Sequence, residues 1–332
     1  MKNSMKKFLG LFIVSTLIFV LAACSTKESS GNTDNSGDKD YPSKPVTLIV
    51  PAAAGGGTDT TARALVASAE KFLGKSIGVV NKTGGSGSVG MTEGANAKPD
   101  GYTVSMVFVE LTMFEHLGLS PLTHNDFKPI ALINLDPAAL TVPADAPYDT
   151  VEEFIAYAKE NPGLKIGNAG TGSIWHIAAE IVGAEAGIEL NHVPFEGAAP
   201  AVTALVGGHV DAVTVSPAEV KTQLDAGNLK TLAVMSDERS NIIPDVPTFS
   251  EAGLEVSNIG TWRGLTVPKD TPDDIVATLE AAFMKAAEQE EFTSFMENSG
   301  LGIQLKSSNE FQQFMDENYE LFGKMIKDLD LH

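Results

Sequence analysis

The chain has 332 residues, of which 43% are hydrophobic and 20% are charged, and its formal net charge at pH 7 is −20. So acidic a protein is repelled by nucleic acid and by anionic lipid, which excludes both as partners held by charge attraction. Cys24 is the only cysteine, so an intramolecular disulfide is excluded and no other thiol is present for catalysis.

The N-terminal residues have the pattern of an export signal. Three lysines precede an apolar run from residue 8 to residue 22, which is too short for a membrane-spanning helix. The run ends in Leu21-Ala22-Ala23-Cys24, which resembles the cleavage box of bacterial lipoproteins. We therefore expect residues 1–23 to be a lipoprotein signal peptide and Cys24 to be the lipidated first residue of the exported chain. The alternative is a small buried cysteine behind an ordinary signal peptide.

The segment after Cys24 has almost no apolar residues. Residues 25–40 consist mainly of Ser, Gly, Asn, Asp and Lys, a composition that cannot bury enough surface to fold. We expect residues 24–43 to be a flexible tether. The folded part would then work outside the cell, anchored to the membrane through Cys24.

From Lys44 onward, short β-rich runs alternate with helical patterns, which predicts an α/β fold with mixed, mostly parallel sheets. Strands are expected at residues 46–50, 77–80, 102–109, 165–167, 190–193 and 212–215. Helices are expected at residues 58–73, 174–186, 199–206 and 309–329, with a short one before Pro99 and another after Thr271. Because similar units occur in two halves of the chain, we expect two lobes.

Two of these helices carry specific expectations. Thr58 or Asp59 is predicted to cap the helix at 58–73, with Phe72 on its buried face. Thr271 is predicted to cap the later helix, since Pro272 follows it and Asp274 lies three residues beyond it.

Glycine-rich loops follow three of the expected strands, each just before a helix. They are Ala54–Thr58, Asn81–Gly87 and Asn168–Ser173, and hydroxyl side chains lie in or beside all three. The start of a helix leaves backbone N–H groups unpaired and carries a partial charge of about +0.5, so such a loop can hold an anion without lysine or arginine. One such loop is more often a tight turn. Three in one α/β chain indicate a cleft for a carboxylate, which accepts hydrogen bonds only.

A series of short motifs extends along the chain after the tether. They are Pro51–Asp59, Asn81 with its glycines, Pro99–Thr103, Gly170–Ser173 with His176, His192–Gly197, Gly207–Asp211 and Pro244–Gly253. In these residues and their order the chain resembles the tripartite tricarboxylate transporter substrate-binding family. The resemblance implies a type II-like, two-lobe periplasmic-binding-protein fold that closes on a carboxylate in the cleft between its lobes.

The resemblance also implies lobe boundaries and a ligand site. Lobe 1 is expected to comprise residues 44–142 and 262–332, and lobe 2 residues 143–261, with Trp262 and Arg263 packed at the second crossing. In the family a ligand carboxylate is held, often through ordered water, by the loops that match Ala54–Thr58 and Ala169–Ser173. The expected ligand-binding residues are Ala54, Gly55, Gly56, Gly57, Thr58, Asp59, Gly85, Ser86, Ala169, Gly170, Thr171, Gly172, Ser173, His176, Phe195, Glu196 and Gly197. No catalytic residue and no metal ligand is expected.

Several of these residues depart from the family or have a structural alternative. Phe195 stands where the family usually has tyrosine, so the identity of the ligand does not carry over from relatives. Asp59 could serve as a helix cap instead of contacting a ligand amine. His176 could be a hydrogen-bonded structural histidine, and Glu196 a solvated surface acid.

The main alternative interpretation is a nucleotide-dependent enzyme. Gly85, Gly87 and Gly90 match the dinucleotide-binding G-x-G-x-x-G pattern, and Glu110 follows at a suitable distance. However, the first glycine comes five residues after the expected strand end at Val80, where the pattern requires it at once. An exported lipoprotein also meets no pool of nicotinamide cofactor.

Hydrolase and zinc chemistry have no support in the sequence. The Gly-Thr-Gly-Ser loop has Trp175 where a nucleophile elbow requires glycine. The six histidines never fall at His-x-x-x-His spacing.

We therefore expect a solute-binding protein, not an enzyme, that needs no cofactor and captures a small carboxylate such as a di- or tricarboxylate. Its expected partners are the membrane subunits of a tripartite transporter, and we expect a monomer. The alternative that remains open is a ligand-binding lobe that signals to a membrane sensor.

Overall fold

The computed structural model describes residues 41–256 and 258–331 of the protein. The expected signal peptide, the lipidation residue Cys24 and most of the expected tether lie outside these residues. No helix in the described ranges is both long enough and apolar enough to cross a membrane.

The first sheet has the strand order β2-β1-β3-β10-β4. Its strands are β1 (Val46–Val50), β2 (Ile77–Asn81), β3 (Thr103–Phe108), β4 (Phe127–Pro137) and β10 (Gly260–Pro268). β1 pairs in parallel with β2 and β3, whereas β10 is antiparallel to both β3 and β4. One of the described strands of this sheet, β10, therefore runs against the other four.

The second sheet repeats this arrangement with the order β7-β6-β8-β5-β9. Its strands are β5 (Ala139–Pro143), β6 (Leu164–Asn168), β7 (Leu190–Pro194), β8 (Ala212–Val213) and β9 (Leu229–Val234). β6 is parallel to β7 and β8, and β5 is antiparallel to β8 and β9. The predicted α/β fold with two lobes and mostly parallel sheets is confirmed.

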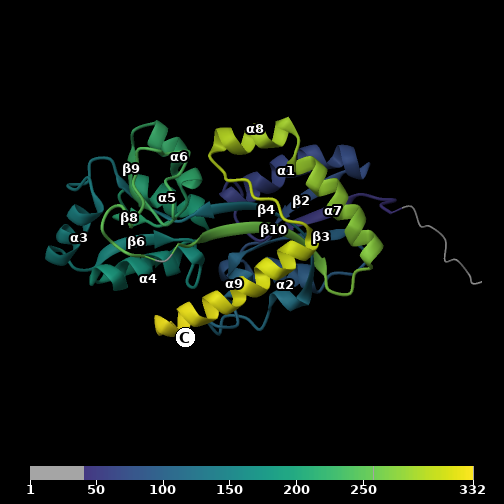
Figure 1. The fold of residues 1–332 in the computed structure, drawn as a ribbon, viewed down its shortest axis with the longest axis horizontal. Helices are drawn as coiled ribbons and strands as arrows, with labels where there is room; N and C mark the ends of the chain where they lie inside the picture. Colours follow the sequence, from purple (N-terminus) through teal and green to yellow (C-terminus); the bar gives the residue numbers. More distant parts are fainter. Residues whose placement is uncertain (1–40, 257, 332) are drawn as a thin grey trace, which may run out of the picture. The chain divides into compact units, whose positions relative to one another are not determined.

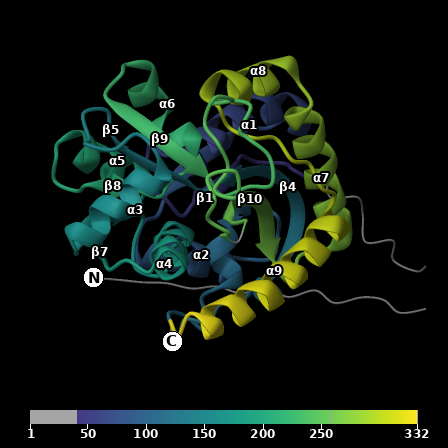
Figure 2. The ribbon, with the colours of Figure 1, turned by 60° about the vertical axis from the view of Figure 1, so that its left-hand side comes forward.

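Helices cover both sheets (Figures 1 and 2). They are α1 (Gly57–Leu73), α2 (Ser88–Ala95), α3 (Val151–Glu160), α4 (Ile174–Ala186), α5 (Ala198–Val206), α6 (Pro217–Asp225), α7 (Asp273–Ala287), α8 (Glu290–Ser299) and α9 (Ser308–Asp328). α1 packs against α7 and α8, and α9 packs on β4 of the first sheet. α4 packs on β7 and α5 on β6 of the second sheet. The helix predicted at 174–186 is confirmed at both ends, and Gly187 after it has the left-handed φ of 62° that ends a helix.

The predicted start of α1 is wrong. The helix begins at Gly57, and the residue before it, Gly56, has extended backbone and offers no side-chain cap. Asp59 instead lies within the first turn, where its carboxylate accepts the N–H of Gly55 at 2.9 Å. Phe72, predicted to be buried, is 40% exposed.

The predicted cap of α7 is also wrong. The helix begins at Asp273, and the residue before it is Pro272. The Thr271 hydroxyl donates to the carbonyl oxygen of Pro268 at 2.7 Å, so it closes the preceding turn instead of capping the helix.

The chain crosses between the sheets at two adjacent places. β4 of the first sheet leads through Ala138 directly into β5 of the second, and β10 returns to the first sheet at Gly260. The Ala138 N–H donates to the Ile259 carbonyl, and the Ala138 carbonyl accepts the Met235 N–H, both at 2.8 Å. The first crossing therefore precedes the boundary expected at residues 142 and 143, because β5 pairs entirely within the second sheet.

Candidate ligand-binding site

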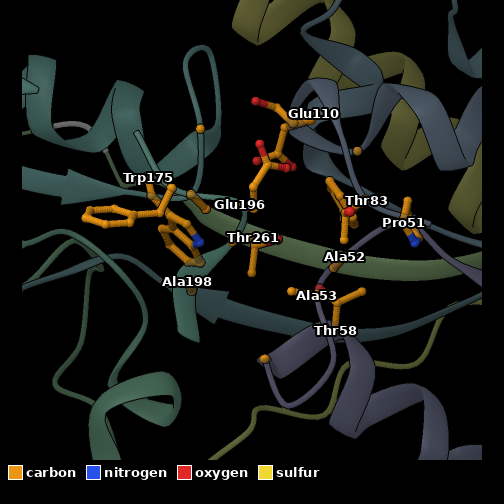
Figure 3. Close-up of a pocket in the computed structure, with 18 of the residues that line it drawn as sticks. Pro51, Ala52, Ala53, Thr58, Thr83, Glu110, Trp175, Glu196, Ala198 and Thr261 are labelled. Atoms are coloured by element: carbon orange, nitrogen blue, oxygen red, sulfur yellow. The ribbon is translucent and has the colours of Figure 1, made fainter. Parts of the chain in front are cut away.

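A cavity of about 730 Å³ lies between loops of the two sheets (Figure 3). The loops after β1 and β2 line it from the first sheet, and the loops after β6 and β7 line it from the second. These are carboxyl ends of parallel strands, where open α/β sheets place their ligands. The volume suits a small organic ligand.

Most of the residues predicted from the sequence line this cavity. They are Gly56, Gly57, Thr58, Gly85, Ser86, Ala169, Gly170, Thr171, Phe195, Glu196 and Gly197. The remaining predicted residues do not line it; they are Ala54, Gly55, Asp59, Gly172, Ser173 and His176. The first loop therefore reaches the cavity through its last residues, at the start of α1.

The start of α1 presents hydrogen-bond donors to the cavity. Its first backbone N–H groups have no partner within the helix, by helix geometry, and the first of them, that of Gly57, donates to Glu219. The Thr58 hydroxyl oxygen accepts a hydrogen bond from Arg263 Nε at 2.9 Å, and Thr58 lines the cavity. Because that oxygen already accepts the arginine N–H, the hydroxyl hydrogen is left to donate to a bound anion.

Arg263, on β10, is 1% exposed and is surrounded by acceptors. Its Nη1 contacts Asp136 Oδ2 at 2.5 Å and also bonds to Asn134 Oδ1. Its Nη2 lies 3.7 Å from Glu219 Oε1, on α6 of the second sheet. The guanidinium group therefore pairs with two carboxylates of the protein itself and orients the Thr58 hydroxyl. Through Glu219 it also links the first sheet to the second.

Glu219 and Gly57 form part of the same contact. Burial raises the pKa of Glu219, although the Arg263 charge and the N–H groups of Ser216 and Gly57 lower it. A Cβ added at Gly57 would lie 2.7 Å from Arg263 Nη2. Glycine is therefore required for α1 to approach the arginine this closely.

Asp59 belongs to a separate network behind the loop. It accepts from Arg63 Nε at 3.0 Å and from Asn81 Nδ2 at 2.9 Å, in addition to the Gly55 N–H. Burial raises the pKa of the Asp59 carboxyl, but these hydrogen bonds outweigh it and hold the pKa below its usual range. The carboxylate thus holds the first loop in shape and does not face the cavity as a contact for a ligand amine.

In the second predicted loop, Ala169–Ser173, the N–H groups of Gly170 and Gly172 and the Ser173 hydroxyl are bonded within the loop and to the start of α4. The Gly170 N–H donates to Asn168 Oδ1 at 3.0 Å, and the Gly172 N–H donates to His176 Nδ1 at 3.2 Å. The Ser173 hydroxyl caps α4 by accepting the His176 N–H at 3.2 Å. Ser173 and His176 therefore stabilise the loop from behind.

Glu110, in the short turn after β3 (Val109–Thr112), lines the cavity although it was not predicted as a ligand residue. Its Oε1 accepts the Ile174 N–H, the first of α4, at 2.8 Å. Its Oε2 is buried and has no hydrogen-bond partner among the described residues. Burial raises the pKa of this carboxyl to about 7. An acid directly after a buried apolar strand was the sequence signal that could have identified it.

A cluster of two histidines and an acid lies outside the cavity lining. His176 Nε2 and His192 Nε2 each lie 3.3 Å from Glu180 Oε1. Because His176 Nδ1 accepts the Gly172 N–H, its proton is on Nε2, where it faces Glu180 and leaves no lone pair for a metal. Burial lowers the pKa of both histidines. The cluster is tied to the second loop through the hydrogen bond between His176 and Gly172.

Aromatic side chains form an apolar wall opposite the first loop. Trp175 is 4% exposed, and Phe195 is half-buried; both line the cavity. Glu196 is exposed and lines the cavity beside Phe195 (Figure 3). The site thus combines neutral donors at one side, acids, and an apolar surface that can cover a hydrocarbon chain.

Comparison with known proteins agrees with this architecture. Residues 61–331 match the family model described as the tripartite tricarboxylate transporter family receptor. A UPF0065 protein of Bordetella pertussis is 32% identical over 98% of this chain and 99% of its own length.

Two solved structures are similar over nearly their full length. MatC (Rpa3494) from Rhodopseudomonas palustris with bound malate is 30% identical, with a TM-score of 0.81 over 86% of this chain and 100% of that chain. Rpa4515 of the same organism, with adipate, is 28% identical, with a TM-score of 0.82 over 88% of this chain and 99% of that chain. The likeness to solute-binding proteins excludes the nucleotide-enzyme and hydrolase alternatives. The chain belongs to the tripartite tricarboxylate transporter receptor family and is a solute-binding protein, not an enzyme.

Proposed function

We propose that this protein is a lipid-anchored, extracytoplasmic receptor that binds a small organic acid and delivers it to the membrane subunits of a tripartite transporter. The observation that carries the binding function is at the start of α1, where Thr58 lines the cavity: its hydroxyl keeps a hydrogen to donate, and its backbone N–H has no partner within the helix. These donors match a carboxylate, which only accepts hydrogen bonds. The malate and adipate in the two similar structures are both carboxylates.

Binding is coupled to closure of the two sheets over the ligand. Three contacts in this structure join the sheets around the cavity: Ser86 Oγ donates to the Thr171 carbonyl at 2.8 Å, Glu110 accepts the Ile174 N–H, and Arg263 meets Glu219. In the closed state a ligand carboxylate is shielded from water, which strengthens its hydrogen bonds. Each bond to a charged group contributes about 1.5–3 kcal/mol, so three or four give micromolar affinity after the entropic cost of association.

A thermal-shift screen of the purified exported chain tests the binding function. Monocarboxylates, di- and tricarboxylates, amino acids and NAD are each added in large excess. A ligand at a hundred times its dissociation constant adds about 2.7 kcal/mol to the free energy of unfolding. Stabilisation by a carboxylate supports the proposal, and stabilisation by NAD alone contradicts it. Loss of uptake of that carboxylate on deletion of the receptor, and not loss of a transcriptional response, separates a transport partner from a sensor.

A further inference from the structure

Thr171 and Gly172 are the part of the second loop that meets residues from the first sheet's side of the cavity. The Thr171 carbonyl accepts the Ser86 hydroxyl at 2.8 Å. A Cβ added at Gly172, whose φ is 74°, would overlap Leu119 and lie 3.1 Å from Leu117 Cδ1. Thr171 itself is exposed and lines the cavity. The conformation of these two residues therefore affects both the ligand site and the contact that closes it.

His176, in the first turn of α4, holds Gly172 in place. The Gly172 N–H donates to His176 Nδ1 at 3.2 Å, so this ring nitrogen must keep its lone pair. The other ring nitrogen, Nε2, carries the proton and lies 3.3 Å from Glu180 Oε1. Protonation of the ring would put a second hydrogen on Nδ1, where it would point at the Gly172 N–H. The hydrogen bond to Gly172 therefore exists only while His176 is neutral.

His192, on β7, strengthens this requirement. Its Nε2 also lies 3.3 Å from Glu180 Oε1, and its ring lies perpendicular to that of His176, with the centroids 4.7 Å apart. His192 Nδ1 is buried and has no hydrogen-bond partner among the described residues. A proton added there would be a buried donor without an acceptor, which is costly. The contacts of the pair thus suit two neutral histidines.

The charges around the pair do not reverse this preference. Burial lowers the pKa of both histidines, and the His192 charge lowers that of His176 further; Glu180 opposes these effects but does not outweigh them. Glu189, the other titratable residue that lines the adjoining cavity with Glu180 and His192, is exposed. Glu110 accepts the first N–H of α4, and its protonation removes a negative charge from the ligand cavity. Its effect on the binding of an anion is therefore opposite in sign to that of the histidines.

We propose that neutral His176 positions Thr171 and Gly172 for closure over the ligand, and that protonation of His176 in acidic surroundings releases this segment and weakens ligand binding. In the closed form Ser86 and Leu119 hold the segment against the ring, whereas in the open form it can move away from a protonated ring. The inference rests on the proposed carboxylate-binding function and adds a condition for ligand release.

The direction of the pH dependence follows from linkage. Because the closed form binds the proton more weakly than the open form, ligand affinity must fall as the proton concentration rises. The fall is expected below the ordinary histidine pKa of 6.5, since the ring in the open form is relieved of the clash with Gly172. Above that pH the affinity should be constant with respect to this group.

Calorimetric titrations of the exported chain with malate, adipate and hexanoate test the inference. The wild type is expected to bind the tightest of these acids about tenfold more weakly at about pH 5.5 than at about pH 7.5, the effect of one linked proton. His176→Asn keeps an acceptor on the same Cγ atom and has no proton to gain, so it should match the wild type at the higher pH and bind almost equally at both. His176→Leu has no acceptor and should bind weakly at both.

His209→Asn is the matched control, because His209 is an exposed histidine outside the cluster. Its affinity should follow the pH profile of the wild type. The hydrogen bond itself is followed by NMR in the ligand-free protein. In the wild type the amide signal of Gly172 should shift as the His176 ring titrates, and in His176→Asn it should not.

The outcomes separate the inference from the proposed function. If the wild type and His176→Asn have parallel pH profiles, or if the Gly172 signal does not follow the ring, the role assigned to His176 is wrong while carboxylate binding stands. If neither these three acids nor any other carboxylate of the screen binds the wild type at either pH, the proposed function fails, and the control of ligand release inferred for His176 fails with it.

Discussion

Arg263 Nε donates to the Thr58 hydroxyl at 2.9 Å, across 205 positions of the chain. This bond fixes the direction in which Thr58 can donate, because its oxygen already accepts. Arg263, which is buried and occupied by the protein's own acceptors, thereby orients a neutral donor at the start of α1. The anion site of this acidic protein is built from oriented dipoles, since the described cation beside it is neutralised by Asp136 and Glu219.

The Thr58 hydroxyl is expected to contribute directly to ligand affinity. Thr58→Val keeps the shape of the side chain and removes the donor, so the dissociation constant for the best carboxylate should rise roughly ten- to a hundredfold, the equivalent of about 1.5–3 kcal/mol. Thr58→Ser retains the hydroxyl and should bind nearly as the wild type does. Calorimetry measures the affinity of both variants for the carboxylate. Equal affinities of Thr58→Val and Thr58→Ser would contradict this prediction.

Arg263 is expected to stabilise the folded protein strongly. Arg263→Met leaves Asp136 buried without its partner, which typically costs about 3–5 kcal/mol. The comparison variant is Arg239→Ala, since Arg239 and its partner Glu251 form an exposed ion pair. Breaking such a surface pair should cost less than about 1 kcal/mol. Urea unfolding of both variants measures the loss in the free energy of unfolding. Similar losses in the two variants would show that the buried pair stabilises the protein no more than the exposed pair does.

Gly57 and Gly56 should respond differently to the same substitution. At Gly57 a Cβ would meet Arg263 Nη2 at 2.7 Å and Glu219 Oε1 at 3.3 Å, whereas at Gly56 its nearest neighbour is the Ala53 oxygen at 3.7 Å. Gly57→Ala should therefore lower the free energy of unfolding by about 1–3 kcal/mol through overpacking. Gly56→Ala should lower it less, by about 0.5–1 kcal/mol, which is the cost of alanine relative to glycine at a helix N-cap. Thermal unfolding of both variants checks this. If their melting temperatures fall by the same amount, the expected clash between the Cβ added at position 57 and Arg263 does not occur.

Glu110 should make stability depend on pH. Burial raises its folded pKa from 4.5 to about 7, with Arg263 opposing and Glu219 reinforcing the shift. Because the folded state holds the proton more tightly, this group stabilises fully below about pH 4.5 and loses that contribution as the pH rises to about 7. Relative to Glu110→Gln, the wild type should lose stability across this window in urea unfolding. Parallel pH profiles of the two proteins would contradict the raised pKa.

Cys24 is expected to anchor the protein. Cys24→Ser removes the thiol that carries the lipid, so the variant should move from the membrane fraction to the soluble extracytoplasmic fraction. Ligand binding by the folded part should be unchanged, because Cys24 lies outside residues 41–331. If the variant stays in the membrane fraction after an alkaline wash, the prediction that Cys24 carries a lipid anchor is wrong.

The local order of the site was predictable from the chain itself. Strand, glycine loop and helix start follow one another within a few residues, so the apolar spacing and the glycines suffice to locate the turn before α1 and the helix at 174–186. The same holds for Gly56, Gly57, Thr58 and the Phe195–Gly197 loop, which line the cavity as expected. The position of a helix start, and therefore of its backbone donors, depends on a few neighbouring residues and can be predicted from them.

The three-dimensional fold alone decided which donors of those loops bond to the protein's own acceptors. Glu110 reaches Ile174 over 64 positions, Arg263 reaches Thr58 over 205, and Asn134 and Asp136 enter through a strand that the sequence pattern did not reveal. Whether an N–H is free depends on which acceptor the fold brings to it. That pairing is set by how the two sheets close on each other, and no spacing along the chain records it.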